Sequence, residues 1–275
     1  MNHTKIPQNF IYPEITPKHY RFGSNQIEAD DLREDGDWRG YLPEPEDQNK
    51  WGVESSSCYV FNQLSAIATL IEEQYQILNS DFSARFNALL SNGTPYGGDP
   101  LKGAESITND GVIKEELLPF LENIKKWSEY HSFVGSDEEA CRKAGQEFLE
   151  DWELKYDIVF DRNDSIEDKY IKLRKALKKS PVPIAVYAWV ENGGVYIKPK
   201  GTEDNHLTLC VYLDEQNRPY YWDSYSPYLK VGEPFYDSSF AMRWSVKKKA
   251  KEPSWWDILL ANLKKYYERL FKKLI

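Results

Sequence analysis

Three side chains of this 275-residue sequence have the types and the order that nucleophilic catalysis by a thiol requires: Cys58, His206 and Asp223. That chemistry needs a thiolate, a neighbouring base, a group that orients the base, and hydrogen-bond donors for the oxyanion. Cys58 stands at the predicted start of a helix, where the helix dipole favours the thiolate. His206 opens a predicted strand, and Asp223 lies on the next one. We therefore expect the carboxylate to accept the imidazole N–H and to fix its tautomer.

The other cysteines and histidines are less suited to this role. Cys141 lies within a charged helical run and Cys210 within a strand, where packing is the ordinary role of a thiol. His3 and His19 belong to a proline-rich N-terminal arm, and His131 lies in a polar stretch. For the cysteine and histidine chosen above, a buried structural thiol and a satisfied core histidine stay open as alternatives.

Helical patterns dominate the part of the chain that surrounds Cys58. Apolar residues recur at helical spacing from Cys58 to Leu78, directly after three serines that suit helix capping, which predicts a long buried helix. Amphipathic or charged runs predict further helices at 82–90, 101–109, 137–153 and 166–179. The residues before 32 show little periodicity, and their prolines indicate an extended arm.

The later part of the chain has the pattern of strands. Segments rich in β-branched and aromatic residues, bounded by turn residues, predict strands at 183–190, 206–213, 219–225 and 240–246. Because helices come first and antiparallel strands come later, we predict an α+β fold in which a helical lobe packs against a sheet lobe.

From about residue 33 to residue 246 the sequence resembles the papain-like cysteine peptidases (C1 family). Ser57-Cys58-Tyr59 has the small residue, cysteine and aromatic residue of the family's local signature, and His206 follows at the separation that the family shows. Other segments are similar to family motifs in the same order: 37–43 to the start of the mature domain, 47–49 to the oxyanion-hole glutamine, 97–98 to a glycine pair, 173–186 to the segment before the sheet lobe, and 223–225 to an Asn-Ser-Trp motif.

The resemblance implies a papain-like two-lobe fold. The left lobe is expected to be helical and the right lobe an antiparallel sheet, with the active-site cleft between them. It implies a peptidase domain at 32–246. The sequence pattern itself predicts an extended N-terminal arm at 1–31 and a basic amphipathic C-terminal helix at 247–275.

The resemblance also implies a cysteine endopeptidase that cleaves peptide bonds through a thioester acyl-enzyme. Cys58 is then the nucleophile, His206 the base and acid, and Asp223 the residue that orients the imidazole. Gln48 supplies the side-chain donor of the oxyanion hole, with a surface glutamine as its alternative. The expected partner is a protein or peptide substrate, and neither a cofactor nor a metal ion is expected.

Four further residues are implied in substrate binding. Gly97 and Gly98 match the glycine pair that hydrogen-bonds an extended substrate backbone, and a plain turn is the alternative. Asp99 is placed to line the second specificity pocket, with a solvated turn residue as its alternative. Tyr225 stands where the family has a tryptophan that shields the catalytic pair.

Several departures from the family pattern leave a second function open. Gln48 lies ten residues before Cys58, whereas the family glutamine lies six before its cysteine, so about four residues are inserted within 50–57. Asp223 replaces an asparagine, and the disulfide cysteine beside the nucleophile is missing. The alternative is a weak or inactive papain-fold protein that acts as a binding or structural component of a larger assembly. A transamidase or peptidoglycan amidase is a third possibility, because an acyl-enzyme does not choose its acceptor.

Composition and charge restrict the class of protein. A hydrophobic content of 41% with 15% aromatic residues is enough for a sizeable core. The net charge of −9 argues against a duplex nucleic-acid binder, which needs a basic face. Three cysteines cannot form a disulfide framework, which favours a reducing compartment. Without a signal-peptide core or an apolar run of membrane length, a cytoplasmic or other intracellular protein is expected.

The tail at 247–275 differs from the rest of the chain. It is rich in lysine and arginine, and its apolar residues step by four and three, which predicts an amphipathic helix. Such a helix suits docking onto the protein's own body or onto a partner helix. Its tryptophans and basic face also suit an anionic membrane surface, so peripheral membrane or assembly association stays open.

Overall fold

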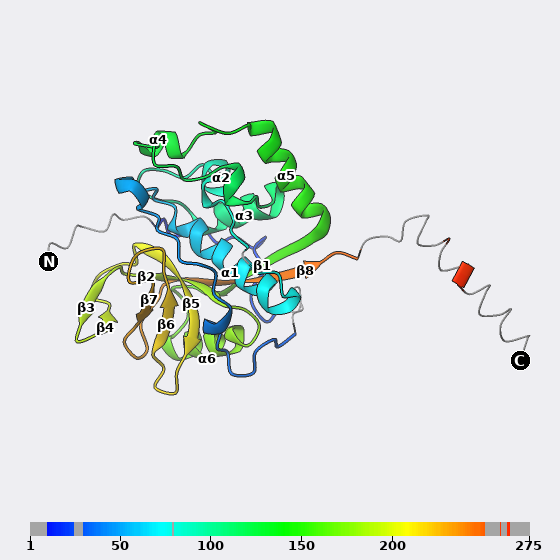
Figure 1. Cartoon of the computed structure of the whole chain (residues 1–275). Coiled ribbons are helices and arrows are strands. Elements are labelled where there is room, and N and C mark those ends of the chain that lie inside the picture. Colours follow the sequence, from blue (N-terminus) through cyan, green and yellow to red (C-terminus); the bar gives the residue numbers. More distant parts are fainter. Residues whose placement is uncertain (1–9, 25–29, 79, 251–258, 260–262, 265–275) are drawn as a thin grey trace, which may run out of the picture.

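The computed structural model describes residues 10–24, 30–78, 80–250, 259 and 263–264 (Figure 1). The predicted C-terminal helix at 247–275 lies mostly outside these residues, as does part of the arm at 1–31. No helix within the described part of the chain is long and apolar enough to cross a membrane.

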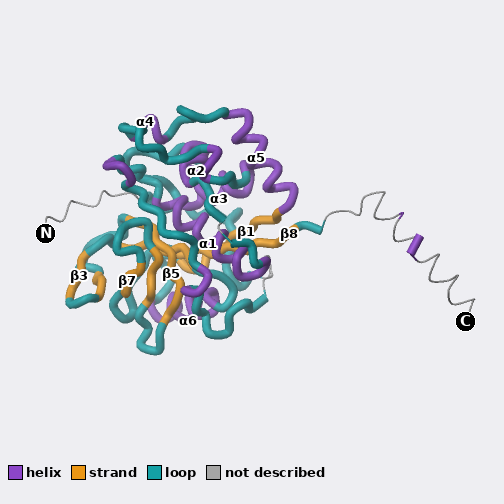
Figure 2. The backbone as a smooth tube through the Cα atoms, in the orientation of Figure 1, coloured by secondary structure: helices purple, strands orange, loops and turns teal. Residues whose placement is uncertain are grey.

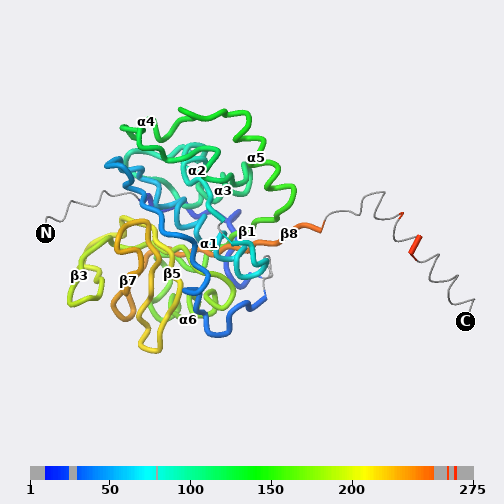
Figure 3. Tube along the Cα trace, viewed as in Figure 1, coloured from blue at the N-terminus to red at the C-terminus, as the bar shows by residue number. Residues whose placement is uncertain are grey.

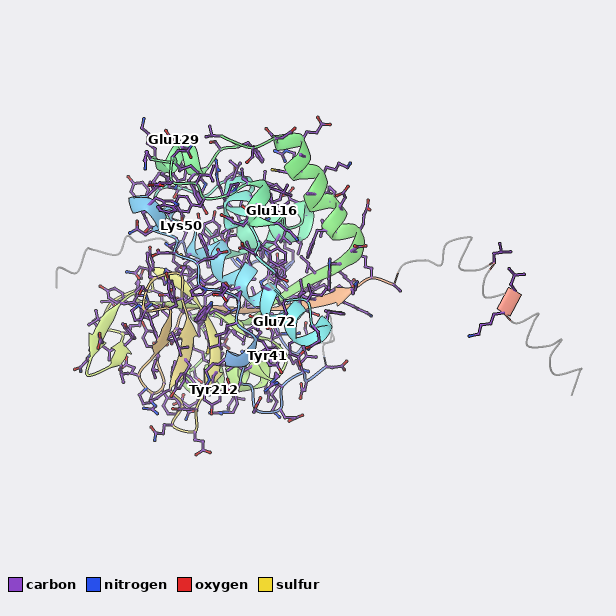
Figure 4. All side chains as sticks on the ribbon, viewed as in Figure 1. Tyr41, Lys50, Glu72, Glu116, Glu129 and Tyr212 are labelled. Atoms are coloured by element: carbon purple, nitrogen blue, oxygen red, sulfur yellow. The ribbon has the colours of Figure 1, made fainter. Side chains whose placement is uncertain are left out.

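Most of the helices occupy one lobe of the molecule (Figure 2). Short 3-10 helices, η1–η3, accompany them in the same part of the sequence. The elements are η1 (Arg39–Tyr41), η2 (Lys50–Gly52), α1 (Cys58–Tyr75), α2 (Ala84–Leu90), α3 (Pro100–Asp110), η3 (Glu115–Leu117), α4 (Trp127–Tyr130) and α5 (Glu138–Asp151). Glu116 and Glu129 lie in this helical lobe, whereas Tyr41 of η1 lies in the other lobe with Tyr212 (Figure 4).

Helix α1 forms the boundary between the two lobes. It packs against α2 and α3 on one side and against β5 (His206–Leu213) and β8 (Ala241–Lys248) on the other. This position explains why nearly every side chain of its first four turns is buried. The helix begins at Cys58 as predicted. It ends at Tyr75, earlier than predicted, because Gln76 adopts a left-handed conformation and donates its N–H to the Glu72 carbonyl.

An antiparallel sheet forms the second lobe, and its first strand follows α5 in the chain (Figure 3). Its strand order is β1-β8-β2-β5-β6-β7, while β3 and β4 form a separate hairpin. Helix α6 (Ile166–Leu177) packs against β1, β2 and β5. The remaining strands are β1 (Trp152–Phe160), β2 (Val182–Val186), β3 (Val190–Asn192), β4 (Val195–Ile197), β6 (Pro219–Trp222) and β7 (Leu229–Val231). The predicted α+β architecture is therefore confirmed.

Strand β1 was not predicted, and its partner β8 is longer than predicted. Helix α5 ends at Asp151 instead of continuing to 153, and β1 follows directly at Trp152. Trp152 pairs with Lys248, so β8 runs two residues beyond the predicted domain boundary at 246. Strands β3, β4 and β7 have three residues each, too few for a recognisable alternating pattern.

Candidate active site

Cys58 is the first residue of α1 and is buried. In the preceding backbone Ser56 adopts a left-handed conformation with a φ of 57°. The Ser57 carbonyl then accepts the N–H groups of Val60 and Phe61, which closes the first helical turn. This arrangement places the thiol at the positive end of the helix dipole.

The side chain of Asn62 connects this helical turn to the strand that carries His206. Its amide donates to the Cys58 carbonyl at 3.0 Å and to the Leu207 carbonyl at 2.6 Å. His206 opens β5 and pairs with Val186 of β2. The start of α1 and the start of β5 are thus fixed relative to each other by a buried hydrogen-bonding side chain.

His206 lies between the thiol and a carboxylate. Its Nε2 is 2.6 Å from Asp223 Oδ1, and both side chains are fully buried. Nδ1 makes no hydrogen bond to nitrogen or oxygen within the described residues, and the ring interacts with Cys58. Burial lowers the pKa of His206. The negative charges of Asp223 and Cys58 and hydrogen bonds to both outweigh burial and raise the pKa to about 10.

Asp223 accepts hydrogen bonds from four groups. Oδ1 accepts from His206 and from the Ser224 backbone N–H at 2.9 Å. Oδ2 accepts from the indole N–H of Trp189 and from Lys230 Nζ, each at 2.7 Å. Burial raises the pKa of Asp223, but the charges of His206 and Lys230 lower it below its ordinary value. Nothing in the local sequence pattern indicated Trp189 or Lys230.

Two aromatic rings enclose the imidazole. Trp189 makes an edge contact with His206 at 5.9 Å between centroids, and Tyr225 lies at 5.3 Å with its plane tilted. Tyr225 therefore lies beside the imidazole, where the resemblance placed a shielding residue. Such rings keep water from the His206–Asp223 pair and strengthen its electrostatic interaction.

Gln48 lies beside the same group of residues, and both polar atoms of its side chain form hydrogen bonds. Its Oε1 accepts from Ser224 Oγ at 2.7 Å. Its Nε2 donates to Glu54 Oε1 at 2.8 Å and to the Tyr225 hydroxyl at 2.5 Å. The amide expected to serve an oxyanion is therefore bound to a carboxylate and to a phenol.

Glu54 lies in the segment 50–57, within which the sequence indicates an insertion before the nucleophile. Besides the Gln48 amide, its carboxylate accepts from the Ser56 backbone N–H at 2.9 Å and from the Tyr225 hydroxyl at 2.7 Å. This segment thus brings a carboxylate among the donors next to Cys58 and His206. The sequence showed the insertion itself but not the role of this residue.

Several solved structures with a similar architecture are cysteine proteases. Xylellain, a cysteine protease from Xylella fastidiosa, matches with a TM-score of 0.58 and 16% identity, covering 88% of this chain and 96% of its own. Digestive procathepsin L 3 from the larval midgut of Tenebrio molitor matches with a TM-score of 0.54 and 17% identity, covering 80% of this chain and 76% of its own. The bromelain protease from Ananas comosus matches with a TM-score of 0.50 and 19% identity, covering 76% of this chain and 97% of its own.

The chain has a papain-like fold. The resemblance found in the sequence is confirmed at the level of the fold, and the low identities mark the chain as divergent. No protein-family model and no curated protein matches the sequence.

Within this papain-like fold the glycine pair is in contact with the N-terminal arm. The Ile11 N–H donates to the Gly98 carbonyl at 3.1 Å, and Phe10 pairs with Gly98 in a parallel bridge. A side chain at Gly98 would overlap the Tyr59 ring, with a Cβ only 2.2 Å from ring carbons. Gly97 pairs with Thr94 through both its N–H and its carbonyl. Of the two glycines, Gly98 is the one that receives an extended segment.

Asp99 caps helix α3. Its Oδ1 accepts the Leu101 backbone N–H at 2.8 Å. Burial raises the pKa of Asp99, although hydrogen bonds from the backbone oppose the shift. The carboxylate is thus held at the helix start next to the glycine pair, in a half-buried position.

In the described part of the chain, the remaining cysteines and His131 make no hydrogen bond to His206 or Asp223 and have other surroundings. Burial raises the pKa of the Cys210 thiol to about 12 and also raises that of Cys141. His131 bonds to the Ser55 carbonyl at 3.1 Å, and burial lowers its pKa to about 4. The residues that the fold brings together are Cys58, His206, Asp223, Gln48 and Tyr225.

Proposed function

We propose that this protein is a cysteine endopeptidase that hydrolyses peptide bonds. The observation that carries the proposal is that the buried His206 ring interacts with Cys58 and places its Nε2 2.6 Å from Asp223 Oδ1. A thiol, an imidazole and a carboxylate in this order form the nucleophile, base and orienting group that acyl transfer requires.

In the proposed reaction the Cys58 thiolate attacks the carbonyl carbon of the scissile peptide bond. The tetrahedral intermediate collapses to a thioester, and His206 Nδ1 gives its proton to the leaving amine. His206 then takes a proton from a water molecule, whose oxygen attacks the thioester. The products are a carboxylic acid and the restored thiolate–imidazolium pair, while Asp223 holds the ring throughout.

The oxyanion requires a rearrangement of Glu54. The proposed donors are the Cys58 backbone N–H and the Gln48 amide, and the latter is bound to the Glu54 carboxylate. A carboxylate at this position repels an oxyanion and competes for its donor. Movement of the Glu54 side chain when substrate binds returns the Gln48 amide to the reaction.

The N-terminal arm restricts access in a second way. Ile11 already occupies the Gly98 carbonyl, which the proposed function assigns to the substrate backbone. Substrate binding through β-type pairing therefore requires displacement of the arm. We propose that the chain as described is in a restrained state whose activity depends on releasing both the arm and Glu54.

These two features also favour a second candidate, a papain-fold protein that binds peptides or partner proteins without efficient turnover. A carboxylate bound to the oxyanion donor weakens transition-state stabilisation, whereas pairing at Gly98 needs no oxyanion. The two candidates differ in whether Cys58 forms an acyl-enzyme.

The test uses an epoxide inhibitor of thiol peptidases and a mixture of fluorogenic peptides under reducing conditions. The endopeptidase predicts a covalent adduct at Cys58, peptide hydrolysis in the parent chain, and loss of both in Cys58→Ala. Cys141→Ala is the matched control, because it removes a buried thiol outside the site, and it should behave as the parent. If the parent chain forms no adduct and hydrolyses no peptide, even after the arm is removed, the endopeptidase proposal is contradicted. The second candidate, the binding protein, is then supported.

A further inference from the structure

Lys230 is buried beside the carboxylate that orients His206. It belongs to β7, opposite Tyr221 of β6, and its side chain is 2% exposed. A lysine is almost never buried to this extent unless its charge is paired. The pairing partner here is Asp223, at 2.7 Å.

The ammonium group of Lys230 is held by three acceptors. Besides Asp223 Oδ2, it donates to the carbonyl oxygens of Tyr225 and Pro227, each at 2.5 Å. These acceptors account for the three donors that a lysine possesses. Lys230 therefore fixes both the Asp223 carboxylate and the loop that follows it.

Aromatic rings cover the remaining side of the ammonium group. Trp189 lies 5.2 Å and Tyr196 lies 5.9 Å from Nζ, within the range of cation–π attraction. Trp189 also donates to the same Asp223 oxygen as Lys230. The indole thus packs against the pair and excludes water from it.

The charges in this buried group balance only when Lys230 is counted. A thiolate, an imidazolium and a carboxylate together carry one net negative charge, and an uncompensated buried charge is strongly destabilising. The ammonium makes the sum zero. A neutral amide in place of Asp223 would give the same sum without any lysine.

We propose that Lys230 is a positioning residue that cancels the charge of Asp223, so that His206 is oriented by a carboxylate that acts, in net charge, like an uncharged amide. The inference rests on the proposed function, because it concerns the same histidine. It explains how the chain carries an aspartate where the resemblance expects an asparagine.

The groups that face this network come from several elements. His206 is faced by Cys58 of α1, by Asp223, and by Tyr225, whose hydroxyl is bound to Glu54. The charged and titratable groups that face Lys230 are Asp223, the more distant Asp47, and Tyr196 of β4. Asp223 is the group that faces both His206 and Lys230, so a change at Lys230 reaches the imidazole mainly through it.

The test measures the titration midpoint of His206 by NMR of histidine-labelled full-length chain. All variants carry Cys58→Ser, which removes the thiolate's influence on the imidazole. Lys230→Met leaves Asp223 uncompensated and should raise the midpoint by about one pH unit or more. Asp223→Asn leaves Lys230 unpaired and should lower it by a similar amount. The double variant Asp223→Asn/Lys230→Met should return to within about half a unit of its parent.

Lys200→Met is the matched control, because Lys200 is an exposed lysine of the same lobe, and it should leave the midpoint unchanged. If Lys230 has only a structural role, His206 should have the same titration midpoint in Asp223→Asn and in the double variant. That result would overturn the proposal. If Lys230→Met fails to fold, folding of the double variant supports the proposal, and its failure to fold contradicts it. No readout depends on hydrolysis, so the charge relationship is tested even if the protein proves not to be a peptidase.

Discussion

The Asn62 side-chain amide lies 2.6 Å from the carbonyl oxygen of Leu207. Leu207 directly follows His206 in β5, and the same amide also binds the Cys58 carbonyl. One buried asparagine therefore sets the relative position of Cys58 and His206, the two residues of the proposed thiolate–imidazolium pair. The contact joins a helix to a strand that is far away in sequence.

Replacement of Asn62 should damage catalysis and stability together. Asn62→Ala removes both hydrogen bonds and leaves two buried carbonyls without this donor, at a cost of about 1–3 kcal/mol in the free energy of unfolding. We expect kcat/KM for a peptide to fall at least about tenfold, because misplacement of the reacting groups is costly. Denaturant unfolding and steady-state kinetics measure the two effects. Asn109→Ala, at an exposed position on α3, is the control, and equal kinetics in both variants would show that Asn62 does not position the pair.

Replacement of the Glu54 carboxylate should increase turnover. Glu54→Gln keeps the size of the side chain but removes the charge that opposes the oxyanion and competes for Gln48. One oxyanion donor contributes about 3–4 kcal/mol in a protease, so partial recovery of Gln48 should raise kcat at least about tenfold. Glu44→Gln, at an exposed position before the same loop, should have no effect. A kcat that falls in Glu54→Gln while the fold is kept would show that the carboxylate supports catalysis.

Loosening of the arm should improve substrate binding. Ile11→Pro removes the N–H that donates to Gly98, whereas Ile11→Ala keeps that N–H and removes most of the side chain. If the arm competes with the substrate backbone, KM should fall several-fold in Ile11→Pro with little change in kcat. Initial rates over a range of peptide concentrations separate the two constants. The same KM in Ile11→Pro, Ile11→Ala and the parent would mean that the arm does not restrict access.

The raised pKa of His206 predicts the pH range over which its charge stabilises the fold. The folded-state pKa of about 10 exceeds the ordinary value of about 6.5 in an unfolded chain. The stabilising contribution is therefore complete below about pH 6.5 and is lost as pH rises toward 10. The difference in unfolding free energy between the parent and His206→Gln should shrink over that interval. A difference that stays constant from pH 6 to 10 would show that His206 is uncharged in the fold throughout.

Much of the site follows from local patterns in the sequence. Cys58 could be placed because serines precede it and helical periodicity follows it, and His206 could be placed because it opens an apolar strand. Their order and separation then matched a known arrangement. Local chain geometry determines these features, so one sequence is enough to show them.

The contacts that modify the site were not predictable in this way. Lys230 and Trp189 reach Asp223 from other strands and turns, and Glu54 reaches Tyr225 across the interface between the lobes. Lys230 and Glu54 are isolated charged residues outside the predicted elements, and the strand pattern around Trp189 does not show which residue its indole contacts. Strand β1 was missed because it begins directly at the end of a charged helix, and its strand character depends on pairing with β8. Tertiary packing decides such features.

Alkylation of Cys58 offers the sharpest test of its pairing with His206. Iodoacetamide is small and neutral, and the modified peptide identifies which of the three cysteines has reacted. At about pH 6 an ordinary thiol is almost fully protonated, whereas a thiolate paired with an imidazolium stays reactive. We expect Cys58 to react at least about tenfold faster in the parent chain than in His206→Gln, with the other two cysteines unreactive in both. Equal rates at Cys58 in the two chains would contradict the thiolate–imidazolium pair and the peptidase mechanism built on it.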